Sequence, residues 1–263
     1  MRRARLLGSM FVGVVIVAAR GAATPPPYDP YDELLKRHTH ETHDLAGVRV
    51  DYAAIAADRE WTVMVDSLWG VSTSAPKEER LAYWIDVYNI LAIDLVARHW
   101  PVASIRDVGS WFRPVWKRDA GLVGFGPGRR AYSLDEIENG ILRPLGDPRV
   151  HMAIVCASVS CPSLAREPYA PWRIDAQLDA AAARFVANRE KGVRVEAHGV
   201  RLSKIFDWFA ADFAPQGGVL AFVRRYATPE LVAALDRLGP DPAISWFHYD
   251  WSANAQPADW TGR

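Results

Sequence analysis

The sequence predicts an α+β fold, a single helix-rich domain around one small, mostly antiparallel sheet. Several long stretches place apolar residues at helical spacing, whereas only a few short stretches have the pattern of strands and hairpins. Half of the 263 residues are hydrophobic and eleven are tryptophan, so the chain can bury a substantial core with many large aromatic side chains.

The N-terminal 23 residues have the pattern of a secretory signal peptide: an arginine-rich start, an apolar run over residues 6–19, then small residues. The run is shorter than the roughly 20 residues that a membrane-spanning helix needs. Arg20 interrupts its end, so an uncleaved anchor is the alternative. We therefore expect an exported protein, periplasmic or secreted.

The rest of the chain is predicted to contain one globular domain. Residues 24–30 include four prolines and are expected to form an extended tether. The domain is expected over residues 31–255, followed by a tail over residues 256–263.

The strongest helix signal lies in residues 77–101, where apolar residues fill nearly every face and Pro101 ends the helix. Such a helix is expected to be buried almost all round. Ser133 and Glu136 have the spacing of a capping box and predict a short helix over residues 133–143. Further helices are predicted over residues 31–40, 51–70, 173–190, 203–213, 217–227 and 228–238.

Strand signals are fewer. Residues 149–156, "RVHMAIVC", form a nearly continuous apolar run and are predicted to be a central strand covered on both faces. Residues 121–134 and 193–203 have hairpin patterns around glycine turns. A last strand is expected within residues 243–251.

Cys156 and Cys161 are the only cysteines. Cys156 fits three interpretations: a small buried hydrophobe, one half of a disulfide with Cys161, or a nucleophile. Export favours the disulfide if the α-carbons lie within roughly 7 Å. A nucleophile needs a base, but His151 would lie on the opposite face of the predicted strand, about 16 Å away. The base would then be another histidine, such as His99 or His248.

Polar residues in apolar surroundings are the other site candidates. His151 is expected to be hydrogen-bonded to a carbonyl or carboxylate, or to act as a base or ligand in a pocket. Asp86 and Asn89 lie on the predicted buried helix, so their side chains must be hydrogen-bonded and either tie the helix to a loop or line a pocket. Glu138 and Asn139 on the short capped helix have the same two interpretations.

One more helix carries polar and aromatic candidates. Lys204 and Asp207 are spaced to pair across a helical turn. Trp208 and Phe209 are expected to pack rather than to bind a ligand.

Metal and cofactor signals are weak. His38, His40 and His43 are closely spaced but do not match a known catalytic zinc motif, so we predict a polar helix end and no metal site. No phosphate loop, dinucleotide fingerprint or serine-nucleophile motif is present, and we predict no cofactor. The formal net charge of zero argues against a nucleic-acid binder.

Five ordered stretches carry a family resemblance: "AYWIDVYNIL", "YSLDEIENGILR", "DPRVHMAIVCASVSCPSL", "LSKIFDWFAADF" and "YDWSAN". The chain resembles the family called domain of unknown function 547 over about residues 31–254, as a bacterial exported member. The resemblance implies no activity; bacterial members resemble secreted or periplasmic proteins, and plant relatives suggest a binding role. Asn139 stands where the family often has histidine, and Asp86 where it often has asparagine.

The most concrete functional hypothesis is a thiol-dependent hydrolase or transferase acting on a peptide or cell-envelope substrate. Cys156 would be the nucleophile, His151 or another histidine the base, and Asn89 or Asn139 an orienting or oxyanion-binding group. The alternative is a non-catalytic binding or scaffolding domain. The expected partner is a peptide, protein or envelope ligand, with membrane contact only through an uncleaved N-terminal segment.

Overall fold

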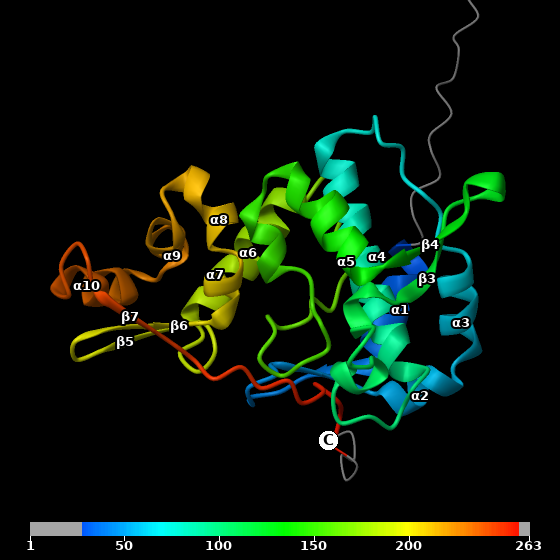
Figure 1. Cartoon of the computed structure of the whole chain (residues 1–263), viewed down its shortest axis with the longest axis horizontal. Coiled ribbons are helices and arrows are strands. Elements are labelled where there is room, and N and C mark those ends of the chain that lie inside the picture. Colours follow the sequence, from blue (N-terminus) through cyan, green and yellow to red (C-terminus); the bar gives the residue numbers. More distant parts are fainter. Residues whose placement is uncertain (1–27, 258–263) are drawn as a thin grey trace, which may run out of the picture.

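The computed structural model describes residues 28–257 and has the predicted α+β fold, with helices predominating (Figure 1). Most helices lie within the ranges that the hydrophobic spacing indicates, but several are shorter or divided. They are α1 (Tyr28–His38), α2 (Tyr52–Ala57), α3 (Arg59–Asp66), α4 (Lys77–Ala97), α5 (Leu134–Ile137), α6 (Ile174–Ala187), α7 (Lys204–Trp208), α8 (Ala210–Phe213), α9 (Val219–Tyr226) and α10 (Pro229–Arg237).

Helix α4 forms the centre of the core. All of its residues from Leu81 to Ala97 are buried, as the apolar residues on every face predict. Two glutamates in its first turn complement the positive end of the helix dipole. α2, α3, α5 and α6 all contact α4. In Figure 1, α1–α3 lie to one side of α4 and α6–α10 to the other.

The strands form three small sheets rather than one. β1 (Thr39–Glu41) pairs with β2 (Val48–Val50), and β3 (Asp119–Val123) with β4 (Arg130–Ser133), both antiparallel. β5 (Val193–Glu196) and β6 (Gly199–Leu202) form an antiparallel hairpin, to which β7 (Ala243–Trp246) adds in parallel. The predicted hairpins and last strand are confirmed. Each strand is only three to five residues long and helices separate the pairs, so no continuous sheet forms.

The predicted central strand over residues 149–156 is wrong. Asp147 caps a 3₁₀ helix, η6 (Pro148–Met152), and proline at its first position favours the helical turn. The next residues, up to Cys156, belong to no strand, and the side chain of Asn89 takes the place of a neighbouring strand. Its amide donates to the Ala153 carbonyl at 3.0 Å and accepts from the Val155 N–H at 2.8 Å. Burial alone produced the strand-like pattern.

The segment after β7 crosses the molecule to the lower centre of Figure 1. There Ser158 pairs with Ala253 in an antiparallel bridge, and the N–H of Val159 donates to the Ser252 carbonyl at 2.9 Å. Asn254 accepts a 2.6 Å hydrogen bond from the hydroxyl of the buried Tyr52. These contacts place the terminal segment beside the loop that carries both cysteines.

The limits of the predicted segments are tested only in part. α1 begins at Tyr28, so the last three residues of the predicted tether are helical. The predicted signal peptide and residues 258–263 of the predicted tail lie outside the described residues. Within residues 28–257, no helix has both the length and the apolar character needed to cross a membrane.

Candidate functional site

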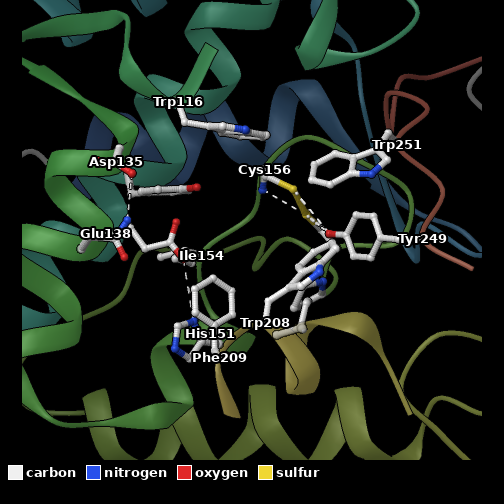
Figure 2. A pocket seen from close by; sticks show the side chains of 15 residues that line it. Trp116, Asp135, Glu138, His151, Ile154, Cys156, Trp208, Phe209, Tyr249 and Trp251 are labelled. Atoms are coloured by element: carbon white, nitrogen blue, oxygen red, sulfur yellow. Dashed lines mark hydrogen bonds and ion pairs between the residues drawn. A yellow bond between two sulfur atoms is a disulfide. The ribbon is translucent and has the colours of Figure 1, made fainter. Parts of the chain in front are cut away.

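A cavity of about 240 Å³ lies where α4, α5, α7, the cysteine loop and the terminal segment meet (Figure 2). One wall is mainly polar and the opposite wall mainly aromatic, with the cysteines between them. The lining residues are Tyr88, Trp116, Asp135, Glu138, Asn139, His151, Ile154, Cys156, Cys161, Pro162, Ile205, Trp208, Phe209, Tyr249 and Trp251.

The polar wall comes from α5 and the helical turn that continues it. The predicted capping box of Ser133 and Glu136 starts α5, which passes at Glu138 into a π-helical turn, η4 (Glu138–Leu142). Such turns are rare and frequently occur at functional sites. Asn139 donates to Asp135 at 2.9 Å and accepts from Arg143 at 2.6 Å, which links the acidic side chains of this wall to a cation.

His151 lies at the base of this wall in a charged network. Arg143 donates two hydrogen bonds to Asp212, at 2.6 and 2.9 Å, and lowers the pKa of that carboxyl. The ionised Asp212 accepts a 2.8 Å hydrogen bond from Nε2 of His151. Burial lowers the pKa of His151 to about 4, so the ring is neutral at pH 7 with a lone pair on Nδ1. Nδ1 is buried and forms no hydrogen bond in the part of the chain that the structure describes.

Glu138 is the second unusual titrating group. Its Oε1 lies 3.9 Å from Nδ1 of His151. Burial raises the pKa of Glu138 to about 7, although Arg143 and Tyr88 oppose the shift. A carboxyl that exchanges protons near neutral pH is suited to acid–base chemistry.

A disulfide joins Cys156 to Cys161, with α-carbons 6.4 Å apart. This is one of the three interpretations that the sequence left open; in this form Cys156 has no thiol that could act as a nucleophile. The two sulfurs have different surroundings. Cys156 is partly exposed and Cys161 only 3% exposed.

The sulfur of Cys161 is surrounded by hydrogen-bond donors. The N–H of Cys156 donates to it at 3.1 Å, and the hydroxyls of Ser158 and Tyr249 lie 3.3 and 3.2 Å away. The hydroxyls of Ser158 and Tyr249 also each lie 3.5 Å from the sulfur of Cys156. Although Cys161 is buried, its sulfur therefore lies in polar surroundings.

The cysteine loop is fixed by a buried lysine and a strained backbone. Nζ of Lys191 donates to the carbonyls of Ala46, Val159 and Cys161 at 3.1, 3.1 and 2.6 Å. Burial lowers the pKa of this ammonium to about 7. Ala157 has a φ of 59°, a left-handed conformation that non-glycine residues rarely adopt.

Residues 72–186 match the family model described as protein of unknown function, DUF547. The chain belongs to the DUF547 family. The matched stretch contains α4, the π-helical turn and both cysteines of the disulfide. No curated protein and no solved structure matches the chain significantly.

Several site residues predicted for this DUF547 protein come together in the cavity. Cys156, His151 and Asn139 line it, whereas Asn89 is used to hold the backbone beneath it. The expected separation of His151 and Cys156 on opposite strand faces is wrong, because η6 is a helical turn and both residues line one cavity.

Other candidates lie elsewhere. His99 hydrogen-bonds the Leu95 carbonyl at 2.8 Å and His248 is exposed; neither lines the cavity. Asp86 ties α4 to a loop by accepting from the N–H of Tyr169 at 3.1 Å, and burial raises the pKa of its carboxyl. Lys204 pairs with Asp207 at 3.0 Å, as predicted.

The histidines of the histidine-rich stretch have different surroundings. His38, expected in a polar helix end, is buried and hydrogen-bonds Asp58 at 2.6 Å, whereas His40 lies on β1. Within the described range 28–257, no three His, Cys, Asp or Glu side chains, those of His38, His40 and His43 included, are grouped so as to hold a metal ion.

The sequence interpretation gave several residues of the site no role in it. Trp208 and Phe209, expected only to pack, line the cavity, and Trp208 remains 47% exposed. Asp212 and Tyr249 contact the site through residues 61 and 88 positions away in the sequence. Ser158 reaches the sulfur of Cys161 across the tight turn between the two cysteines. The available signal was that all three fall within the sequence stretches shared with the family.

Proposed function

We propose that this DUF547 protein is a thiol–disulfide oxidoreductase that passes its Cys156–Cys161 disulfide to pairs of thiols in exported polypeptides. The observation that carries the proposal is the asymmetry of the disulfide. Both cysteines line the cavity, but Cys156 is partly exposed whereas Cys161 is buried. The sulfur of Cys161 accepts from the N–H of Cys156 and lies nearer to the hydroxyls of Ser158 and Tyr249, at 3.3 and 3.2 Å, than the sulfur of Cys156 does, at 3.5 Å from each. This arrangement separates the sulfur that is attacked from the sulfur that leaves.

In the first step a substrate thiolate attacks Sγ of Cys156. A substrate–Cys156 disulfide forms, the Cys156–Cys161 bond breaks, and Cys161 leaves as a thiolate. In the second step another substrate thiolate attacks the substrate sulfur of the mixed disulfide, and Cys156 leaves. The substrate loses two electrons and gains a disulfide, the protein gains two thiols, and the two substrate protons end on the two cysteines. A second disulfide compound, protein or small molecule, restores the starting state.

The donors around Cys161 favour this direction. A thiolate accepts hydrogen bonds more strongly than a neutral disulfide sulfur, so the N–H of Cys156 and the hydroxyls of Ser158 and Tyr249 stabilise the reduced form most. Stabilising the reduced form makes a disulfide a stronger oxidant, and a better leaving group breaks away faster.

Glu138 supplies a proton acceptor in the same cavity. The attacking group must be a thiolate, whereas a free cysteine thiol is largely protonated at neutral pH. A carboxyl with a pKa of about 7 is partly ionised there and can take the substrate proton.

The hydrolase or transferase that the sequence predicts would need Cys156 as a free thiol, so it stays a prediction for the reduced form. The non-catalytic binding domain is the alternative to any enzyme. Export of the protein is part of the proposal, because an oxidising compartment keeps such a disulfide formed.

The test is oxidation of a peptide with two cysteines. The disulfide form of the protein is mixed with a reduced peptide, and mass spectrometry follows the peptide while maleimide labelling counts protein thiols. We expect one peptide disulfide to form for each protein that gains two thiols.

Two variants sharpen this test. Tyr249→Phe keeps the ring and removes one donor to Cys161, so peptide oxidation is expected to slow by about tenfold, the effect of one hydrogen bond to a charged group. Ser252→Ala is the matched control, because within residues 28–257 the Ser252 hydroxyl hydrogen-bonds only Asp250, which does not line the cavity. Peptide oxidation no faster than in buffer, or equal rates in wild type and Tyr249→Phe, would contradict the proposal.

A further inference from the structure

We infer that the cavity beside the disulfide binds an arginine side chain of the polypeptide substrate, with its guanidinium between the carboxylate wall and the aromatic wall. This inference rests on the proposed function for its substrate, a cysteine-containing polypeptide. The binding site itself is argued from contacts that do not involve sulfur.

The polar wall offers hydrogen-bond acceptors. Nε2 of His151 donates to Asp212, which leaves Nδ1 as an acceptor; the side chain is 1% exposed, and Nδ1 forms no hydrogen bond within the described chain. Oε1 of Glu138 lies 3.9 Å from that nitrogen, and Asp135 lines the same cavity. A buried acceptor without a donor is costly, so this wall is complementary to a ligand rich in N–H groups.

The charge of the polar wall also favours a cationic ligand. Arg143 is committed to Asp212 and Asn139. Across residues 28–257, neither Asp135 nor Glu138 forms an ion pair with a lysine or arginine. The two carboxyls therefore face the cavity with no positive side chain bonded to them.

The opposite wall favours a planar cation over a compact one. Trp208, Tyr249 and Trp251 pack against one another with ring centroids 4.6–5.8 Å apart, and Trp251 also contacts Trp116 at 5.7 Å. Figure 2 shows Tyr249 and Trp251 across the cavity from Glu138. A guanidinium stacks on aromatic faces and forks towards carboxylates, whereas an ammonium does neither as well.

Two guanidinium groups of the protein already lie over aromatic rings that line the cavity. The guanidinium of Arg106 lies 5.3 Å from the ring centroid of Trp251, and that of Arg143 lies 5.2 Å from Phe209. The cavity volume of about 240 Å³ is just below the roughly 300–1,000 Å³ of pockets for drug-sized ligands. It therefore suits one long side chain rather than a folded segment.

The experiment compares two reduced peptides that contain a pair of cysteines and differ at one neighbouring residue, arginine or citrulline. Citrulline has nearly the same shape but no charge. We expect the KM for oxidation by the disulfide form of the protein to be about tenfold lower for the arginine peptide. Asp135→Asn should reduce this preference, whereas Asp66→Asn, the same change on an exposed part of α3, should keep it.

The outcomes separate this inference from the proposed function. If both peptides are oxidised with equal KM, arginine binding is refuted and the oxidoreductase stands. If neither is oxidised, the oxidoreductase is refuted, and tryptophan fluorescence then compares N-acetylarginine amide with N-acetylcitrulline amide. Tighter binding of the arginine compound supports the cation site; equal binding overturns it.

Discussion

Asn89 provides a direct test of how the floor of the site is held. Its amide bonds the Ala153 carbonyl at 3.0 Å and the Val155 N–H at 2.8 Å, and the residue is 2% exposed. Asn89→Ala leaves one acceptor and one donor buried without partners. Each such group costs about 1–3 kcal/mol, so the free energy of unfolding should fall by about 2–6 kcal/mol. This is a large part of the about 5–15 kcal/mol typical of a folded domain.

Urea unfolding, followed by tryptophan fluorescence, measures the effect. Asn139→Ala is the matched control, because Asn139 is exposed and its two hydrogen-bond partners remain accessible to water. We expect this control to lose no more than about 1 kcal/mol. A loss below about 1 kcal/mol in Asn89→Ala would refute the view that this amide replaces a neighbouring strand.

Three further predictions concern pH and the cysteine loop. Folding lowers the pKa of His151 from 6.5 to about 4, so the stability that this residue contributes is lost as the pH falls from 6.5 to 4. Folding raises the pKa of Glu138 from 4.5 to about 7, so the stability that this residue contributes is lost as the pH rises from 4.5 to 7. Glu138→Gln removes the pH dependence that opposes that of His151. As the pH falls from 7 to 4.5, the free energy of unfolding of the variant, measured by urea titration, should therefore decrease by about 3 kcal/mol more than that of wild type. Parallel pH profiles for the two proteins would contradict this prediction. Lys191→Met leaves three buried carbonyls without their donor and should destabilise the protein by about 2–4 kcal/mol, whereas a thermal unfolding midpoint equal to that of wild type would speak against this role. Ala157→Gly should raise the free energy of unfolding by up to about 1 kcal/mol, because glycine adopts the left-handed conformation without strain; a decrease would argue against that conformation.

Local patterns predicted much of the fold. The apolar faces of α4, the capping box at Ser133 and the two hairpins depend on residues close together in the chain, and the structure confirms all of them. The prediction of a strand over residues 149–156 failed because burial on all sides produces the same apolar run whether or not a strand partner exists. The partner is one amide on α4, more than 60 residues away.

The site was predictable only in part, for the same reason. The sequence singled out Cys156, His151 and Asn139, which do line one cavity. The sequence could not show that Asp212 orients His151 or that Tyr249 reaches the disulfide, because these contacts join residues that are 61 and 88 positions apart. The parallel addition of β7 and the bridge between Ser158 and Ala253 bring the terminal segment there, and neither has a local signal.

The most direct test of disulfide exchange is to trap its intermediate. Cys161→Ser leaves Cys156 as the only thiol and removes the group that would resolve a mixed disulfide. When this variant is mixed with a peptide containing one internal disulfide, mass spectrometry should show the peptide attached to Cys156. Cys156→Ser should remain unmodified, because Cys161 is 3% exposed. No adduct on Cys156, or equal adducts on the two single-cysteine variants, would contradict the proposed exchange.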